Sequence, residues 1–134
     1  MRRALGVILG LVLALAFVTV GQAADFPTKE VQVVIPWAAG GATDLVFRAL
    51  AASTSKHLGK AVVVVNKPGG AGAVGYTEVM QAQPDGYTLV TAVTPLTILP
   101  HQTKTAFTYQ NFEPIINVVQ DPAMFQVQAD SPWK

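Results

Sequence analysis

Short apolar runs alternate with longer stretches of helical periodicity along most of the chain. Residues 31–35 read Val-Gln-Val-Val-Ile and stop at Pro36, and residues 61–65 read Ala-Val-Val-Val-Val with no polar alternation. Strands that are apolar on both faces are typical of the middle of a covered parallel sheet. The pattern therefore predicts two buried parallel strands.

Two helices are predicted to follow these strands. Residues 43–58 carry apolar side chains at helical spacing, with Thr43 or Asp44 as the N-cap candidate and Gly59 in the C-cap position. A second, shorter helix is predicted from about residue 74 to residue 81.

A turn and a third strand complete the alternation. Residues 84–86 read Pro-Asp-Gly, which is typical of a tight turn, and residues 87–93 are predicted to form a strand. The order strand-helix-strand-helix-strand implies right-handed crossovers and a mainly parallel sheet, which is an α/β fold. After Pro95 the pattern weakens to a proline-marked stretch, followed by possible strands at 115–119 and 124–128.

The first two dozen residues have a different pattern from the rest. Two arginines precede an apolar run over residues 5–20, and Gly21 and Ala23 are small residues at positions −3 and −1 of a cut after residue 23. This arrangement predicts a secretory signal peptide over residues 1–23. An uncleaved anchor helix is the alternative, because the run approaches the roughly 20 residues that span a bilayer. Export without any cysteine fits a periplasmic location.

Composition and charge exclude several classes of function. Nine Lys and Arg residues face eight Asp and Glu residues, for a formal net charge of +1, and the chain has no cysteine. Near-neutral charge argues against a nucleic-acid partner, and the absence of cysteine excludes disulfides, thiolate nucleophiles and cysteine zinc sites. His57 and His101 have no acidic partner at ligand spacing, and no serine lies in a nucleophile elbow. We therefore expect no metal, no cofactor, no catalytic residue and no enzyme activity.

The loop that leaves the first strand is a candidate binding site, because open parallel sheets bind ligands at the carboxyl ends of their strands. Two adjacent glycines at a helix start let a ligand approach free backbone N–H groups, which favours a carboxylate. Asp44 is expected to cap the helix, and Trp37 either stacks on a ligand or packs at the rim. A plain strand-to-helix turn is the alternative. The candidates are Trp37, Ala38, Ala39, Gly40, Gly41, Ala42, Thr43 and Asp44.

The loop after the second strand is also rich in glycine. Gly70, Gly72 and Gly75 form a literal G-x-G-x-x-G, but residues 66–68 separate the strand from the glycines and no acidic residue ends the next strand. A dinucleotide-binding enzyme fragment needs both features and is the less favoured alternative. A second helix entrance facing the same crevice is the better interpretation, with a loop that only passes beneath the next strand as the other alternative. The candidates are Gly69, Gly70, Ala71 and Gly72.

Five short blocks occur in a fixed order over residues 25–134. They are Asp25-Phe26-Pro27-Thr28-Lys29; Val34-Ile35-Pro36-Trp37 with Gly40-Gly41 and Asp44; Asn66-Lys67-Pro68-Gly69-Gly70; Pro84-Asp85-Gly86-Tyr87-Thr88-Leu89; and Asp130-Ser131-Pro132-Trp133. Together they resemble the Bug or TctC-like family, the periplasmic substrate-binding proteins of tripartite tricarboxylate transporters.

The resemblance implies a periplasmic-binding-protein-like fold of type II, a two-lobed flytrap that captures a small carboxylate and presents it to membrane permease subunits. It implies that residues 36–44 grip a ligand carboxylate largely through backbone groups, and that the loop after the second strand lines the same cleft. The resemblance also implies that the positions matching residues 94–97, Thr94 among them, face the ligand. Here residues 94–97 read Thr-Pro-Leu-Thr and depart from the commoner Gly/Ser/Thr-rich form, which leaves the substrate unidentified.

The expected organisation is a signal peptide over residues 1–23, a first α/β lobe over 24–110 and a crossing segment over 111–134. Family members carry a whole second lobe, so we expect a chain truncated before that lobe, either a fragment or a truncated product. Such receptors gain affinity by closing two lobes around the solute, so one lobe is expected to bind weakly at best. A non-functional truncated product is the alternative.

Overall fold

A computed structural model describes residues 25–120 and 126–132 of the chain, and the predicted signal peptide lies outside these ranges. Within the described ranges, no helix is both long and apolar enough to cross a membrane. The elements in chain order are β1 (Val31–Ile35), α2 (Ala42–Leu58), β2 (Val62–Asn66), the 3-10 helix η1 (Gly70–Gly72), α3 (Ala73–Met80), β3 (Thr88–Val90), α4 (Pro95–Gln102) and the 3-10 helix η2 (Tyr109–Asn111).

The three strands form a parallel sheet in the order β2-β1-β3. Val33 of β1 pairs with Val64 on one side and with Leu89 on the other, and β1 is almost wholly buried. The predicted α/β fold with a parallel sheet is therefore confirmed. The prediction that both valine-rich strands lie in the middle of the sheet is wrong for β2. Among the described strands β2 pairs only with β1, so it lies at an edge of this sheet, and Val63 stays 36% exposed.

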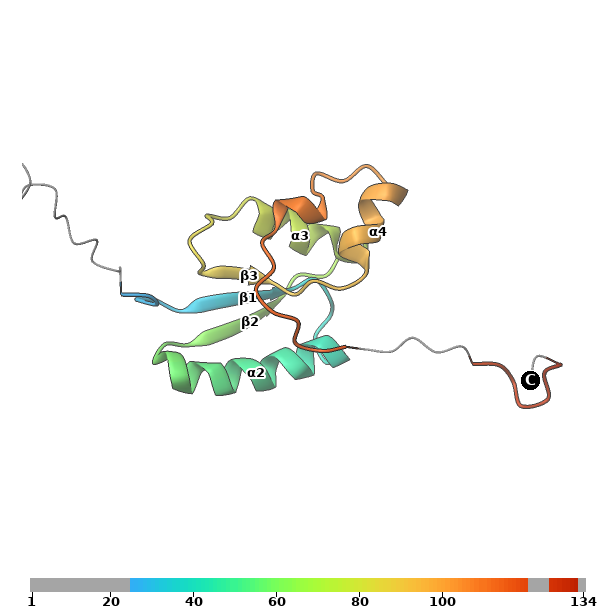
Figure 1. Cartoon of the computed structure of the whole chain (residues 1–134), viewed down its shortest axis with the longest axis horizontal. Coiled ribbons are helices and arrows are strands. Elements are labelled where there is room, and N and C mark those ends of the chain that lie inside the picture. The colour runs from blue at the N-terminus through green and yellow to red at the C-terminus, as the bar shows by residue number, and fades with distance from the viewer. Residues whose placement is uncertain (1–24, 121–125, 133–134) are drawn as a thin grey trace, which may run out of the picture.

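Helices cover the two faces of the sheet unequally (Figure 1). Helix α2 lies on one face, and α3 and α4 lie on the other. The main hydrophobic core is on the α3 and α4 face. There the ring centroids of Tyr76 and Phe107 lie 5.3 Å apart, and Leu96 and Leu99 pack beside them. Helix α2 instead leaves Leu45 61% exposed. The aromatic core therefore belongs to one layer of the fold.

Helix α4 lies in the proline-marked stretch, to which the sequence pattern assigns no element. Pro95 occupies the start of the helix, where its missing N–H costs no intrahelical bond, and Pro100 lies further inside. Leu96 and Leu99, three residues apart, both belong to the core. Burial of these leucines thus accounts for a helix at a place where local propensity opposes one.

Other predicted boundaries also differ from the structure. Strand β3 is shorter than the predicted 87–93, because the chain leaves the sheet after the Thr91 amide donates to the Val34 carbonyl. The strand predicted at 115–119 is wrong: these residues pair with no described strand, and Ile116 is 77% exposed. Of the strand predicted at 124–128, residues 124–125 lie outside the described ranges and the other three are not in a strand.

Candidate functional site

The carboxyl ends of the three parallel strands lie at one edge of the sheet, and the predicted loops leave from there. The Lys67 amide donates to the Ile35 carbonyl (2.8 Å), and the Thr91 amide donates to the Val34 carbonyl (3.0 Å). The chain segments that follow β2 and β3 thus begin on either side of the end of β1. Thr94 comes three residues later, at the N-terminus of α4.

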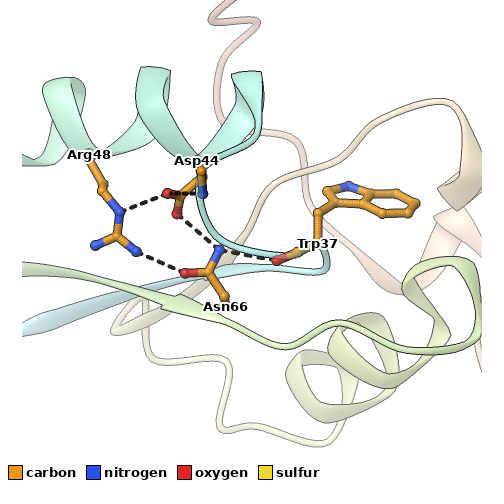
Figure 2. A network of polar contacts seen from close by, with 5 residues as sticks. Trp37, Asp44, Arg48 and Asn66 are labelled. Atoms are coloured by element: carbon orange, nitrogen blue, oxygen red, sulfur yellow. Dashed lines mark hydrogen bonds and ion pairs between the residues drawn. The ribbon is translucent and has the colours of Figure 1, made fainter.

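The loop between β1 and α2 is held by a network of side-chain hydrogen bonds (Figure 2). One carboxylate oxygen of Asp44, Oδ2, accepts from the Gly40 amide and from Arg48 Nε, each at 2.9 Å. The other, Oδ1, accepts from Asn66 Nδ2 at 2.9 Å. Asn66 Nδ2 also donates to the Trp37 carbonyl (3.1 Å), and Asn66 Oδ1 accepts from Arg48 Nη2 (2.8 Å). The network joins the loop, the first turns of α2 and the end of β2.

Asp44 therefore does not cap helix α2. The N-cap residue is Gly41, and no side chain forms a cap hydrogen bond there, so the expected capping by Thr43 or Asp44 is wrong. The physical reason is that the carboxylate turns back towards the Gly40 amide and Arg48. The hydrogen bond from Arg48, then those from Gly40 and Asn66, hold the pKa of Asp44 well below its usual range. Asp44 is thus an ionised carboxylate although its side chain is only 3% exposed.

The start of α2 presents backbone donors that the helix itself does not use. The first helical bond in the loop runs from the Leu45 amide to the Gly41 carbonyl. The amides of Gly41, Ala42, Thr43 and Asp44 precede this bond and have no carbonyl within the helix to donate to. The Gly40 amide differs, because it already donates to Asp44. An anion at this helix start would find its donors among the amides that follow Gly40.

The second loop is shaped mainly by backbone torsions, with an ion pair between Lys67 and Glu78 of α3 at 3.3 Å. Four successive residues have positive φ: Gly69 (141°), Gly70 (54°), Ala71 (52°) and Gly72 (99°). A Cβ at Gly72 would lie 2.9 Å from the Tyr76 ring and 3.3 Å from Pro36, and a Cβ at Gly75 would lie 3.1 Å from Pro36. The glycines therefore allow this loop and α3 to pack tightly against the end of β1.

A cavity of about 440 Å³ lies on the second loop and away from the first. It is lined by η1 and α3 on one side and by α4 with the chain that follows it on the other. The lining includes Gly70, Ala71, Thr77, Leu99, Lys104 and Phe107. No residue of the first loop lines this cavity, and neither does Thr94. Within the described residues, no group of three or more His, Asp and Glu side chains could hold a metal ion.

The sequence alone does not identify Arg48 as part of the site, and it does not predict the hydrogen bonds of the Asn66 side chain. The spacing of Asp44 and Arg48, four residues apart on a predicted helix, is a signal for an ion pair on one helix face. Asn66 at the end of a predicted strand is a signal for a polar side chain at the binding edge. Neither signal alone predicts that the two side chains meet at one carboxylate.

Comparison with known proteins decides the family. Residues 46–134 match the family model TctC, described as the tripartite tricarboxylate transporter family receptor. The chain belongs to the TctC receptor family. It is 40% identical over 119 residues to a UPF0065 protein of Cupriavidus necator, covering 84% of this chain and 35% of the relative. It is 37% identical over 91 residues to BugT of Bordetella pertussis, covering 67% of this chain and 28% of BugT. The chain spans about a third of the length of the first curated relatives.

Three solved structures have the same fold over the matched part. A TctC solute binding protein from Polaromonas, solved without ligand, matches with a TM-score of 0.60 and 36% identity over 63% of this chain and 30% of that one. MatC from Rhodopseudomonas palustris, with bound malate, matches with a TM-score of 0.54 and 35% identity over 62% and 29%. An R. palustris protein with adipate matches with a TM-score of 0.52 and 33% identity over 54% and 24%. The predicted resemblance to the family and the periplasmic-binding-protein-like fold are confirmed.

Proposed function

We propose that this chain forms the first lobe of a periplasmic receptor that captures a small carboxylate for a tripartite transporter. Its membrane permease subunits would then receive the solute from the receptor. The observation that carries the proposal is that two related structures, 33% and 35% identical to this chain, hold the dicarboxylates adipate and malate. A receptor of this family binds and releases its solute without chemical change, so no residue is assigned a catalytic role.

The ligand carboxylate would lie at the start of α2. Gly41, Ala42 and Thr43 would supply backbone N–H donors, and the positive end of the α2 dipole would add attraction. The nearby negative charge of Asp44 is paired with Arg48, which reduces repulsion of an anion. The second loop, residues 69–72, and Thr94 would line the same edge of the sheet as further contacts.

A titration followed by backbone NMR tests this proposal. The full chain, labelled with ¹⁵N, is titrated with malate and with adipate, and malamide serves as a control ligand that has the carbon skeleton of malate but no carboxylate. We expect amide shifts at residues 41–43 with the dicarboxylates and none with malamide. Equal shifts with malate and malamide, or shifts that avoid this loop, would contradict the proposal.

Export is a separate part of the proposal. The two N-terminal arginines, the apolar run over residues 5–20 and the small residues at positions 21 and 23 support cleavage after Ala23. Mass spectrometry of the protein expressed in a Gram-negative host should find a mature chain that begins at Ala24 in the periplasmic fraction. A full-length mass in the membrane fraction would show instead that the leader stays as an anchor.

A further inference from the structure

Asp44 and Asn66 are the most highly connected polar side chains of the candidate site, with three hydrogen bonds each. Both carboxylate oxygens of Asp44 are engaged, by one backbone amide and by side chains from two different elements. Its side chain is 3% exposed, whereas that of its ion-pair partner Arg48 is 48% exposed. A buried carboxylate with three donors is fixed in place, because each donor restricts its rotation and compensates its desolvation.

This arrangement is poorly suited to direct contact with an anionic solute. An ionised carboxylate repels a second carboxylate, and Asp44 has no N–H or O–H to donate. Arg48 is also engaged, because its Nε donates to Asp44 and its Nη2 donates to Asn66. The charges of Asp44 and Arg48 therefore neutralise each other. The loop backbone that these side chains hold is the part that would contact the ligand.

Asn66 extends this effect from one loop to the other. It is the last residue of β2, so it stands where the second loop begins. Its side-chain amide nitrogen donates to the Trp37 carbonyl and to Asp44, and both acceptors belong to the first loop or to the helix that follows it. One side chain thus ties the backbone of the first loop to the strand that carries the second.

We propose that Asp44 is a positioning residue of the carboxylate site: together with Asn66, it fixes the Gly40 and Trp37 backbone so that the next three amides are correctly oriented before the solute arrives. This inference rests on the proposed function for the identity of the solute. The fixed loop backbone is a property of the protein alone, and it is measurable without any ligand.

Asp44→Asn is the decisive variant, because it removes the charge and one acceptor at nearly constant side-chain volume. A side-chain amide has one acceptor oxygen, so the substituted residue presents its NH₂ group either to Asn66 Nδ2 or to Gly40 and Arg48. In both orientations, one donor faces another. We expect hydrogen exchange of the Gly40 amide to become at least about tenfold faster, since in one orientation its acceptor is replaced by an NH₂ group and in the other its acceptor loses the charge. Trp37 emission should shift as well, measured in a Trp133→Phe background to leave one tryptophan.

Two references separate positioning from general stability. The first is the Val33 amide in the centre of β1, whose exchange reports global opening. The second is Asp85→Asn, the same substitution at an exposed aspartate that accepts from the Tyr87 amide and pairs with Lys29. Positioning requires that Gly40 exchange accelerate more than Val33 exchange in Asp44→Asn, and that Asp85→Asn not accelerate Gly40 exchange beyond Val33 exchange. Equal acceleration of Gly40 and Val33 in Asp44→Asn, or none at Gly40, would overturn the proposal.

A second variant covers the case in which Asp44→Asn does not fold. Asn66→Ala keeps the bond from Gly40 to Asp44 but removes both donations from Asn66. It should shift Trp37 emission and weaken the malate response at residues 41–43, while Gly40 stays protected. An unchanged Trp37 spectrum would overturn the coupling by Asn66. If the unmodified chain gives no malate response at all, the proposed function fails, and the exchange data still decide whether Asp44 positions the loop.

Discussion

Residues 36–41 after β1 and residues 67–72 after β2 are both glycine-rich helix entrances, yet different forces hold their backbones. The first loop depends on hydrogen bonds from Asp44 and Asn66, and a Cβ at Gly40 would have no atom within 4 Å. In the second loop, a Cβ at Gly72 would lie 2.9 Å from the Tyr76 ring. The comparison shows that two loops with similar composition differ in what they tolerate. The first loop does not tolerate the loss of a polar partner, and the second does not tolerate a larger side chain.

The largest effect is expected from Gly72→Val in the second loop. The substitution forces a β-branched residue into φ 99° and places its Cβ against Tyr76 and Pro36. Strain and overpacking together should lower the free energy of unfolding by about 3 kcal/mol or more. Gly40→Val is the matched control, since its φ is 86° but its surroundings are open, and it should cost only the strain of that backbone conformation, about 1–2 kcal/mol. Urea unfolding of both variants checks this, and equal losses would contradict the packing account.

The sequence predicts the parts of the fold that depend on local pattern. The boundaries of β1 agree with the prediction, and Gly59 ends α2 with a left-handed conformation as its position indicates. The glycines at both loops are also recognisable, because a glycine pair after a strand is a local signal. Helix α4 is not predictable in this way, because the burial of Leu96 beside Phe107 is a tertiary effect that local propensity does not contain.

The candidate site is predictable only in outline, for a similar reason. Its loops follow from the rule that parallel strands bind ligands at their carboxyl ends. The meeting of Asp44, Arg48 and Asn66 depends on how α2 packs beside β2, and no spacing between residues 44 and 66 encodes that contact. Capping is the best local interpretation of Asp44, and the competing partners Gly40 and Arg48 make it wrong.

The next effect in size concerns pH and the first loop. The Arg48 hydrogen bond is the largest cause of the lowered pKa of Asp44, so the carboxylate stabilises the folded state at neutral pH. The pKa of Asp44 in the folded state lies below the unfolded value of about 4. This stabilisation is therefore lost progressively as the pH falls from about 4 towards the folded pKa. Between pH 2 and 4, unfolding of the unmodified chain should therefore bind more protons than unfolding of Asp44→Asn, by at most about one proton. Urea titrations from pH 2 to 6 measure this, and parallel stability curves for the two proteins would refute it.

A smaller change in stability is expected at Gly41, where a substitution should abolish binding but leave the fold nearly as stable. Its φ is −76°, an ordinary value for any residue, and a Cβ would contact only the Ala38 carbonyl at 3.8 Å. Gly41→Val should change the free energy of unfolding by less than about 1 kcal/mol. A bulky side chain at the helix start should nevertheless obstruct approach to the amides and abolish the malate response at residues 41–43. Retained malate shifts in the folded variant would place the ligand elsewhere.

The smallest expected effect is a change in stability on substitution of alanine by glycine, and its sign should differ between the two loops. Ala71 is the one residue other than glycine with positive φ in the described part of the chain, and a left-handed alanine costs about 1 kcal/mol. Glycine removes that strain but gives the unfolded chain more freedom, a loss of about 0.4–1 kcal/mol, so Ala71→Gly should be neutral or stabilise by up to about 0.6 kcal/mol. Ala39→Gly in the first loop relieves no such strain and should destabilise by about 0.4–1 kcal/mol. Precise thermal or urea unfolding of the pair is the measurement. Destabilisation of the same size in both variants would show that the second loop stores no strain at Ala71, and that close packing alone distinguishes it from the first.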